Sequence, residues 1–416
     1  MSSDGSGTLA RRLGLRDAVV IGLGSMIGAG VFSAFAPAAG AAGSALLLAL
    51  AVAAVVAYAN AMSSARLAAI YPESGGTYVY GRERLAPFWG YLAGWGFVVG
   101  KTASCAAMAL TVGYYAAPEY APLVGAAAVT VLTGLNYTGL QKSATLTRAI
   151  VAFVLLTLAA VVAGAAFGDT PADRELVALG GAGVPGTLQG AAFLFFAFAG
   201  YARIATLGEE VRDPARTIPR AIPVALGIAL AVYAAVAVAL LAVLGPTGIA
   251  ETSAPLAAAA QASGWAWVEP VVRAGAVVAA VGSLLSLLLG VSRTTLAMAR
   301  DGHLPRTLAA VHPRYRVPHH AELAVGAVVV VVVLLADVRS AIGFSSFAVL
   351  AYYAIANASA LTVRHTATSV IVPTVGLVGC VALAVSLPLD STVAGFSVLT
   401  LGALIWVLRR RTRTTR

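Results

Sequence analysis

The sequence predicts an all-α membrane protein with twelve transmembrane helices. Of the 416 residues, 60% are hydrophobic and 11% are charged, and the mean hydropathy is +0.89; a soluble domain has about 25% charged residues. The apolar residues form continuous runs, as in residues 45–57, without the alternation of a barrel strand. Helices are therefore the expected spanning structure, and an ordinary soluble enzyme is excluded.

Twelve apolar segments are long enough to cross a bilayer, which takes about 20 residues each. Spans one to six are expected at 17–38, 43–67, 87–116, 121–137, 147–167 and 188–208. Spans seven to twelve are expected at 219–244, 268–296, 322–336, 340–363, 368–388 and 391–408. The connecting loops are short, so the chain is expected to form one transmembrane domain over residues 1–416.

The distribution of positive charge predicts the orientation. Of the 27 Lys and Arg residues, 22 fall in the segments on the side of the N-terminus, three on the far side and two within spans. Cytoplasmic loops of membrane proteins carry the excess of Lys and Arg. Both termini are therefore expected in the cytoplasm of a multi-pass protein of the cell membrane. The net charge of +10 follows from this topology, and no nucleic-acid partner is predicted.

Span one is interrupted by four glycines within nine residues, between Gly22 and Gly30. Each glycine costs a helix about 1 kcal/mol relative to alanine. The pattern does not fit a dinucleotide-binding fingerprint, because no acidic residue follows about 20 positions later. Helix packing through Gly24 and Gly28 is the alternative explanation.

Span six carries a matching interruption at Gly200, inside an aromatic stretch that ends with Tyr201. The two breaks lie five spans apart, one in span one and one in span six. Interrupted helices at corresponding positions of two halves point to an inverted-repeat secondary transporter with its site at the bilayer midplane. Free N–H groups at a break suit a carboxylate and free carbonyls suit an amino group, so a zwitterionic amino acid would satisfy both.

Four blocks of residues resemble the amino acid/polyamine/organocation (APC) superfamily, in its prokaryotic amino acid permease branch, over nearly the whole chain. The blocks are Gly24-Ser-Met-Ile-Gly-Ala-Gly-Val-Phe32; Tyr71-Pro-Glu-Ser-Gly-Gly-Thr-Tyr-Val-Tyr80 with Gly94-Trp95; Phe195-Phe-Ala-Phe-Ala-Gly-Tyr201 with Glu209, Glu210, Asp213-Pro214, Arg216 and Ile218-Pro-Arg-Ala-Ile222; and Ser292-Arg293, Ala297-Met-Ala-Arg-Asp-Gly302, Leu304-Pro305 and Val311-His-Pro-Arg314.

The resemblance implies a LeuT-type fold of five plus five helices and two extra C-terminal helices, with alternating access for an L-amino acid. The first repeat would cover residues 17–167, the second 188–363 and the extra helices 368–408. The resemblance also implies a substrate site at both breaks. Its expected residues are Met26, Ile27, Gly28, Ala29 and Gly30 for the carboxylate, and Phe196, Ala197, Ala199 and Gly200 around the amino group.

Two departures from the family bear on coupling and specificity. Some proton-coupled members carry a lysine in span five, where this chain has Val154, whereas Lys101 lies in the middle of span three. Intramembrane lysines are costly and tend to be functional, so Lys101 is the candidate for proton coupling; snorkelling or a tie to backbone carbonyls is the alternative. Ala202 replaces an acidic residue common in relatives, and Arg203 follows it, which favours neutral amino acids as substrates.

Other functions remain as alternatives. An amino acid exchanger and a polyamine or organocation permease would use the same frame. An intramembrane enzyme lacks a hydrolase motif such as H-E-x-x-H, and a channel lacks rings of one charge sign. Ser283 and Ser286 in span eight suggest sodium coupling only weakly. The histidines are expected in cytoplasmic loops without zinc-ligand spacing, so neither a catalytic residue, a metal nor a cofactor is predicted.

Overall fold

The computed structural model describes residues 13–71, 75–139, 144–168, 182–205, 211–363 and 368–414. Within these ranges the regular structure is helical, apart from one isolated parallel bridge between Leu13 and Val211. The α-helices are α1 (Leu15–Met26), α2 (Ala29–Ser33), α3 (Phe35–Ala42), α4 (Leu46–Ile70), α5 (Thr77–Arg84), α6 (Pro87–Ala116), α7 (Ala121–Tyr137), α8 (Ala144–Phe167), α9 (Gly183–Phe198), α10 (Ala202–Ala205), α11 (Pro214–Ala250), α12 (Pro255–Ala262), α13 (Glu269–Arg300), α14 (His319–Leu335), α15 (Val338–Leu361), α16 (Thr368–Ser386) and α17 (Leu389–Thr414). Five short 3₁₀ turns join them: η1 (Gly43–Ala45), η2 (Pro118–Tyr120), η3 (Ala199–Tyr201), η4 (Ala266–Val268) and η5 (Arg306–Ala309).

Each predicted span overlaps at least one helix of the structure. In the described part of the chain, ten helical stretches are long and apolar enough to cross a membrane. The fourth and ninth predicted spans correspond to α7 and α14, which have 17 residues each. Long apolar runs therefore located these helices, and α6 and α7 match their predicted ranges end to end; the count of twelve spans stays a prediction.

Some boundaries were wrong for physical reasons. Span one was expected to end at residue 38, but α3 continues to Ala42. Span seven extends to Ala250 through a kink at Gly245, whose φ of 68° lies in the left-handed region that glycine tolerates. His319 and His320, expected in a loop, form the first turn of α14. The eight-residue helices α5 and α12 are too short to be seen as spans.

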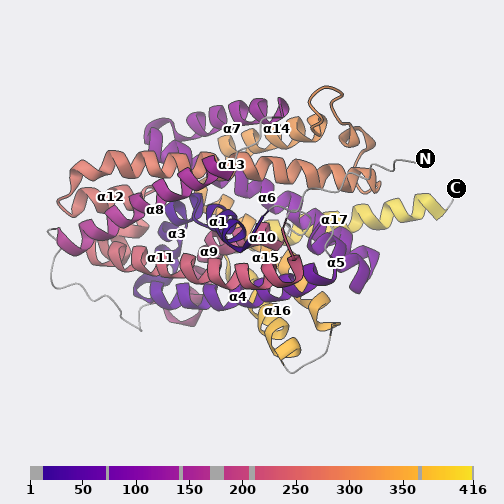
Figure 1. Cartoon of the computed structure of the whole chain (residues 1–416), viewed down its shortest axis with the longest axis horizontal. Coiled ribbons are helices and arrows are strands. Elements are labelled where there is room, and N and C mark those ends of the chain that lie inside the picture. The colour runs from indigo at the N-terminus through magenta and orange to yellow at the C-terminus, as the bar shows by residue number, and fades with distance from the viewer. Residues whose placement is uncertain are drawn as a thin grey trace.

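Helices of the two halves pack against each other in matching pairs. α3 packs on α9, α4 on α11, α6 on α13 and α7 on α14; α7 and α14 lie side by side along one edge of the bundle (Figure 1). These contacts pair spans one to four with spans six to nine. The C-terminal helices lie outside this arrangement: α16 packs on α4 and α15, and α17 on α6 and α15.

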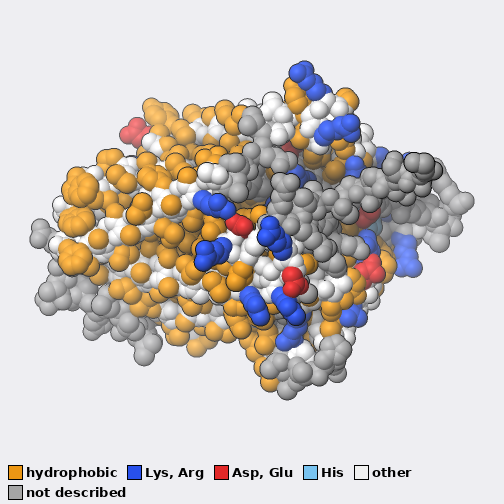
Figure 2. Space-filling model, viewed as in Figure 1, with side chains coloured by type: hydrophobic (Ala, Val, Ile, Leu, Met, Phe, Trp, Pro, Cys, Tyr) orange, Lys and Arg blue, Asp and Glu red, His pale blue; other side chains and the backbone are white. Residues whose placement is uncertain are grey.

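The surface separates charge from apolar area along the long axis of the bundle. On the face shown in Figure 2, Lys and Arg side chains gather over the centre and the right-hand end, while hydrophobic side chains cover the left-hand half. Large apolar side chains such as Leu156, Leu335 and Val378 are exposed. An apolar surface of this extent is stable against lipid and not against water, so the chain is a multi-pass membrane protein.

Candidate functional site

The helix of span one is interrupted at two residues. Ile27 has φ −79° and ψ 58°, and Gly28 has φ −113° and ψ −141°, so neither is helical. The Gly28 N–H donates to the Met26 carbonyl at 2.8 Å in place of a helical bond. The first N–H groups of α2 have no partner within their own helix, as at any helix start. The local sequence explains the break, because glycine has a low helix propensity.

The break in span six is the 3₁₀ turn Ala199–Tyr201 between α9 and α10, and it lies directly against the break in span one. A Cβ atom on Gly200 would lie 2.1 Å from the Ser25 carbonyl oxygen and 2.7 Å from the Met26 nitrogen. A Cβ atom on Gly30 would lie 2.6 Å from the Ala197 Cα. The two breaks therefore approach backbone to backbone, and glycine at these positions is what permits the approach.

The structure thus brings together the two groups of residues expected from the sequence. Met26 to Gly30 and Ala197 to Gly200 meet between α1, α2, α9 and η3. Phe196 lies on the same stretch and is buried, and its carbonyl accepts the Ala199 N–H. The role of these residues in binding a substrate remains a prediction.

Two tyrosines that the sequence analysis missed donate to carbonyl groups at the breaks, and one of them, Tyr233, joins the two breaks. The Tyr233 hydroxyl, on α11, lies 2.7 Å from the Met26 carbonyl oxygen and 3.0 Å from the Ala197 carbonyl oxygen. The Tyr353 hydroxyl, on α15, lies 3.4 Å from the Ala199 carbonyl oxygen. A signal was available for Tyr233, because it is the one side chain with a polar group in residues 221–245.

We expect Tyr233→Phe to reduce transport about fivefold while leaving insertion intact. The change removes the hydroxyl shared by the two carbonyls, and one buried hydrogen bond contributes about 1 kcal/mol, which corresponds to about a factor of five in an equilibrium. The measurement is the initial rate of amino acid uptake by proteoliposomes. Tyr58→Phe, at an exposed position of α4, is the control; equal rates for both variants would show that Tyr233 does not position the breaks.

Ser283 is the residue of α13 that faces the span-one break. A Cβ atom on Gly28 would lie 2.0 Å from the Ser283 Oγ, so this hydroxyl sits directly against the Gly28 Cα. Ser286, in contrast, donates to the Gly282 carbonyl of its own helix at 3.1 Å. Of the two serines considered for sodium, only Ser283 is placed beside the break. Within the described ranges, no group of three or more His, Cys, Asp or Glu side chains could hold a metal ion.

Lys101 is buried on the face of α6 that runs toward the breaks. Its side chain is 8% exposed, and no hydrogen bond or ion pair joins it to another residue in the part of the chain that the structure describes. Met108 and Val112 follow at helical spacing on the same face, and Val112 packs in a buried cluster with Ala29 and Ala280. Val154, which stands where relatives carry a lysine, is completely buried in the apolar core of α8.

A second set of sequence motifs meets at the end of the bundle where α5 lies. The Tyr78 hydroxyl, on α5, donates to an Asp301 carboxylate oxygen and lies 2.9 Å from the His303 Nδ1. Burial and the neighbouring Asp301 carboxylate raise the pKa of Tyr78, so this hydroxyl stays a donor. The Thr77 N–H donates to the Tyr352 hydroxyl at 3.0 Å. Residues more than 200 positions apart in the sequence thus hold α5 against the C-terminal end of α13 and against α15.

The N-terminal end of span one is held by an ion pair and a backbone bridge. The Arg148 guanidinium on α8 lies 2.5 Å from the Asp17 carboxylate on α1. The Arg212 N–H donates to the Leu13 carbonyl at 2.9 Å beside the isolated bridge. Arg203 is exposed on α10, and Glu209 and Glu210, which follow it in the third sequence block, lie outside the described residues. These contacts tie the N-terminal ends of spans one and five to the segment that precedes α11.

Comparison with known proteins identifies the family. A sequence profile described as "Amino acid permease" matches residues 13–411. The chain belongs to the amino acid permease family. This family lies within the APC superfamily, as the four sequence blocks indicated, and its members are transporters rather than enzymes.

The relatives of this permease are transporters from bacteria and eukaryotes. The chain is 68% identical to an uncharacterized transporter of Mycobacterium tuberculosis over 405 residues, which covers 97% of this chain and 92% of that protein. It is 26% identical to a branched-chain amino acid permease of Bacillus subtilis, over 77% of this chain and 74% of that protein. It is 29% identical to cationic amino acid transporter 4 of Homo sapiens, over 86% of this chain and 60% of that protein. These relationships support amino acid transport by the chain.

Proposed function

We propose that this permease is a secondary active transporter that moves neutral L-amino acids across the cell membrane by alternating access. The observation that carries the proposal is the direct approach of two broken helices, at Gly28 and at Gly200. Interrupted helices supply unpaired backbone groups in a medium that offers no water to satisfy them. Such groups suit the carboxylate and the amino group of an amino acid, with the carboxylate at Met26 to Gly30.

The architecture proposed for this cycle is twelve spans with two inverted repeats of five, at 17–167 and 188–363, and extra helices at 368–408. The pairing of α3 with α9, α4 with α11, α6 with α13 and α7 with α14 supports it, because corresponding helices of the two halves are neighbours. Motion of one part of the bundle against the other would expose the breaks to each side in turn.

A neutral substrate is favoured by the charges around the breaks. In the described part of the chain, Lys101 and Glu322 are the charged residues that are buried, and Glu322 lies on α14, which is not one of the broken helices. A cationic side chain would therefore have no carboxylate at the breaks to meet. The name of the Bacillus subtilis relative agrees with this choice, whereas that of the human relative favours cationic substrates.

Proton symport through Lys101 is proposed as the driving reaction, with amino acid exchange as the competing mode. Burial makes a charged amine costly, so a lysine that meets water on one side of the membrane and is sealed afterwards can take up and release a proton. Lys101 is buried on the helix face that leads to Ala29.

Uptake by proteoliposomes tests substrate and coupling together. The purified chain is reconstituted and offered radiolabelled alanine, leucine, glutamate, lysine and a polyamine, each with and without an inward proton gradient. We expect accumulation of alanine or leucine that requires the gradient. Accumulation of lysine or the polyamine would reject the neutral substrate class, and uptake only against preloaded amino acid would assign an exchanger.

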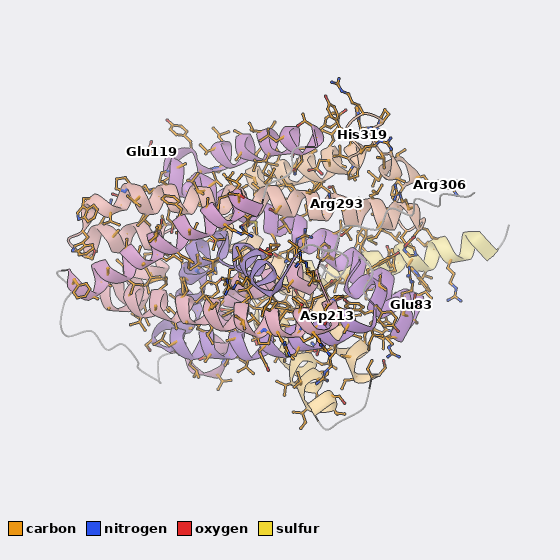
Figure 3. The ribbon with its side chains drawn as sticks, viewed as in Figure 1. Glu83, Glu119, Asp213, Arg293, Arg306 and His319 are labelled. Atoms are coloured by element: carbon orange, nitrogen blue, oxygen red, sulfur yellow. The ribbon has the colours of Figure 1, made fainter. Side chains whose placement is uncertain are left out.

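The proposed orientation places both termini in the cytoplasm, and it predicts the labelling of two new cysteines. A cysteine at Arg306 is expected to react with a membrane-impermeant maleimide only from the cytoplasmic side, and one at Asp390 only from outside. Both sites are exposed in the structure, and the native Cys105 and Cys380 are buried, which keeps the background low. Glu119 lies at the opposite end of the bundle from Glu83 and Arg306 (Figure 3), so a cysteine there should label with Asp390. Labelling from the reverse sides would overturn the orientation.

A further inference from the structure

Glu322 is a buried carboxylate that the transport cycle described above does not use. Its side chain on α14 is 1% exposed. Asn136 on α7 donates its Nδ2–H to one carboxylate oxygen at 2.9 Å, and Ser292 on α13 donates its hydroxyl to the other. Three helices therefore converge on one carboxyl group. Among the described residues, no basic side chain forms an ion pair with this group.

The hydrogen-bond geometry of Ser292 suits both protonation states of Glu322. The Ser292 Oγ lies within hydrogen-bond distance of the Glu322 Oε2 and also 3.1 Å from the Leu289 carbonyl oxygen. A hydroxyl has one hydrogen to donate and can accept from another donor. When Glu322 is a carboxylate, Ser292 donates to it. When Glu322 is protonated, its O–H can donate to Ser292, and Ser292 can turn its own hydrogen to Leu289.

Asn136 provides a second acceptor beside the carboxyl group. Its Nδ2 also donates to the Leu285 carbonyl at 3.2 Å, while its Oδ1 is buried with no partner among the described residues. A buried acceptor without a donor is costly, and a rotation of the amide would present it to a protonated Glu322. The surroundings can therefore satisfy the carboxyl group with or without its proton.

The apolar residues next to Glu322 also join α14 to the helix of Lys101. Cys105, one turn beyond Lys101 on α6, packs in one buried cluster with Leu288 and Val291 of α13 and with Val325 of α14, the helices that carry Ser292 and Glu322. Lys101 and Glu322 are the two buried charged residues of the described chain, and this cluster connects the helices on which they lie.

Other charged or titratable groups lie on the elements around Glu322. Among them are Lys101 and Cys105 on α6, Tyr137 on α7, Arg293 on α13, Arg306 on η5, and His319 and His320 on α14 itself. Arg293 is exposed and acts on Glu322 electrostatically. His319 and Arg293 mark the part of the bundle in which the cluster lies (Figure 3).

We propose that Glu322 is a second protonation site of the carrier and takes up and releases a proton during the transport cycle. The carboxylate gains one proton from water and becomes a carboxylic acid, and the acid later returns the proton to water. In the protonated form no net charge is buried at this position. The proposal rests on the proposed proton-coupled transport and names the group that completes it.

Infrared spectroscopy tests the protonation without requiring a substrate. The full chain in liposomes is taken through a pH titration, and the carbonyl band of a protonated carboxylic acid is followed. We expect a component of this band that disappears as the pH rises, that is missing in Glu322→Gln and that is kept by Glu119→Gln, the same substitution at an exposed site. The other carboxyl groups contribute equally to the wild type and to the variant, so the difference between the two titrations isolates Glu322. Identical titrations of the band in the wild type and in Glu322→Gln would overturn the proposal.

Uptake then tests coupling. A gradient of one pH unit supports about tenfold accumulation for one proton per substrate. With radiolabelled leucine and alanine, Glu322→Gln should fall from this level to equal concentrations on both sides while it still exchanges substrate. Glu322→Asp, which keeps the acid, should retain part of the accumulation. Wild-type accumulation by a folded Glu322→Gln variant would contradict the role of Glu322, whereas a wild-type protein that transports neither amino acid would contradict the proposed function and leave the infrared result to decide the protonation site.

Discussion

Replacing Gly200 with alanine is expected to abolish transport. The added Cβ atom would lie 2.1 Å from the Ser25 carbonyl oxygen and 2.3 Å from the Ser25 carbonyl carbon. Both are backbone atoms, so the overlap can be relieved only by moving the two breaks apart. Overpacking of this kind costs up to about 3 kcal/mol, which corresponds to about a hundredfold loss in the population of the competent arrangement. The initial rate of uptake into proteoliposomes measures it.

Two other glycines calibrate this result. Gly290 on α13 has no atom within 4 Å of its Cβ position, so Gly290→Ala is expected to transport at the wild-type rate. Gly28→Ala should fall between the two, because its added Cβ meets the Ser283 hydroxyl, which can rotate away. A Gly200→Ala protein that inserts and transports as well as Gly290→Ala would place the substrate site away from the paired breaks.

Lys101→Ala is expected to uncouple accumulation from the proton gradient. Without the amine no proton moves with the substrate, so a gradient of one pH unit should give no accumulation instead of about tenfold, while exchange of substrate across the membrane continues. Lys101→Arg should slow the whole cycle, because a guanidinium does not release its proton in this pH range. Concentrations at steady state and rates of exchange separate these outcomes.

The neighbouring Thr102 supplies the control for Lys101. Its hydroxyl donates to the Val98 carbonyl within α6 at 2.7 Å, so Thr102→Ala changes the same helix without touching the proposed proton site. We expect Thr102→Ala to accumulate substrate like the wild type. If Lys101→Ala liposomes accumulate as much as Thr102→Ala liposomes under the same gradient, Lys101 is only a packed residue and the coupling group lies elsewhere.

The sequence motifs of this family acquire a physical meaning in the structure. Tyr78 belongs to one block and Asp301 to another, and the two side chains are hydrogen-bonded. Gly30 and Ala197 likewise belong to separate blocks and are in backbone contact. The blocks are therefore the segments where distant helices touch closely, and small residues or paired polar groups are the residues that allow such contact.

The sequence by itself determined the class of protein, the positions of the spanning helices and both interruptions. Apolar length and glycine content are local properties, and in a bilayer each span must satisfy its own backbone hydrogen bonds. That is why the predicted ranges of α6 and α7 match the structure, and why Gly28 and Gly200 could be singled out before any fold was known.

Only the tertiary structure decided which side chains meet at the breaks and around the buried charges. Tyr233 lies 207 positions from Met26, and Glu322 lies 186 positions from Asn136. Contacts over such separations leave no periodic trace in a chain whose spans are nearly uniform in hydrophobicity. Glu322 stood at the predicted start of a span, where a carboxylate is ordinarily solvated; it is buried because α7 and α13 close over it. Packing between helices, which depends on three-dimensional approach rather than on local hydrophobicity, is the physical reason for the difference.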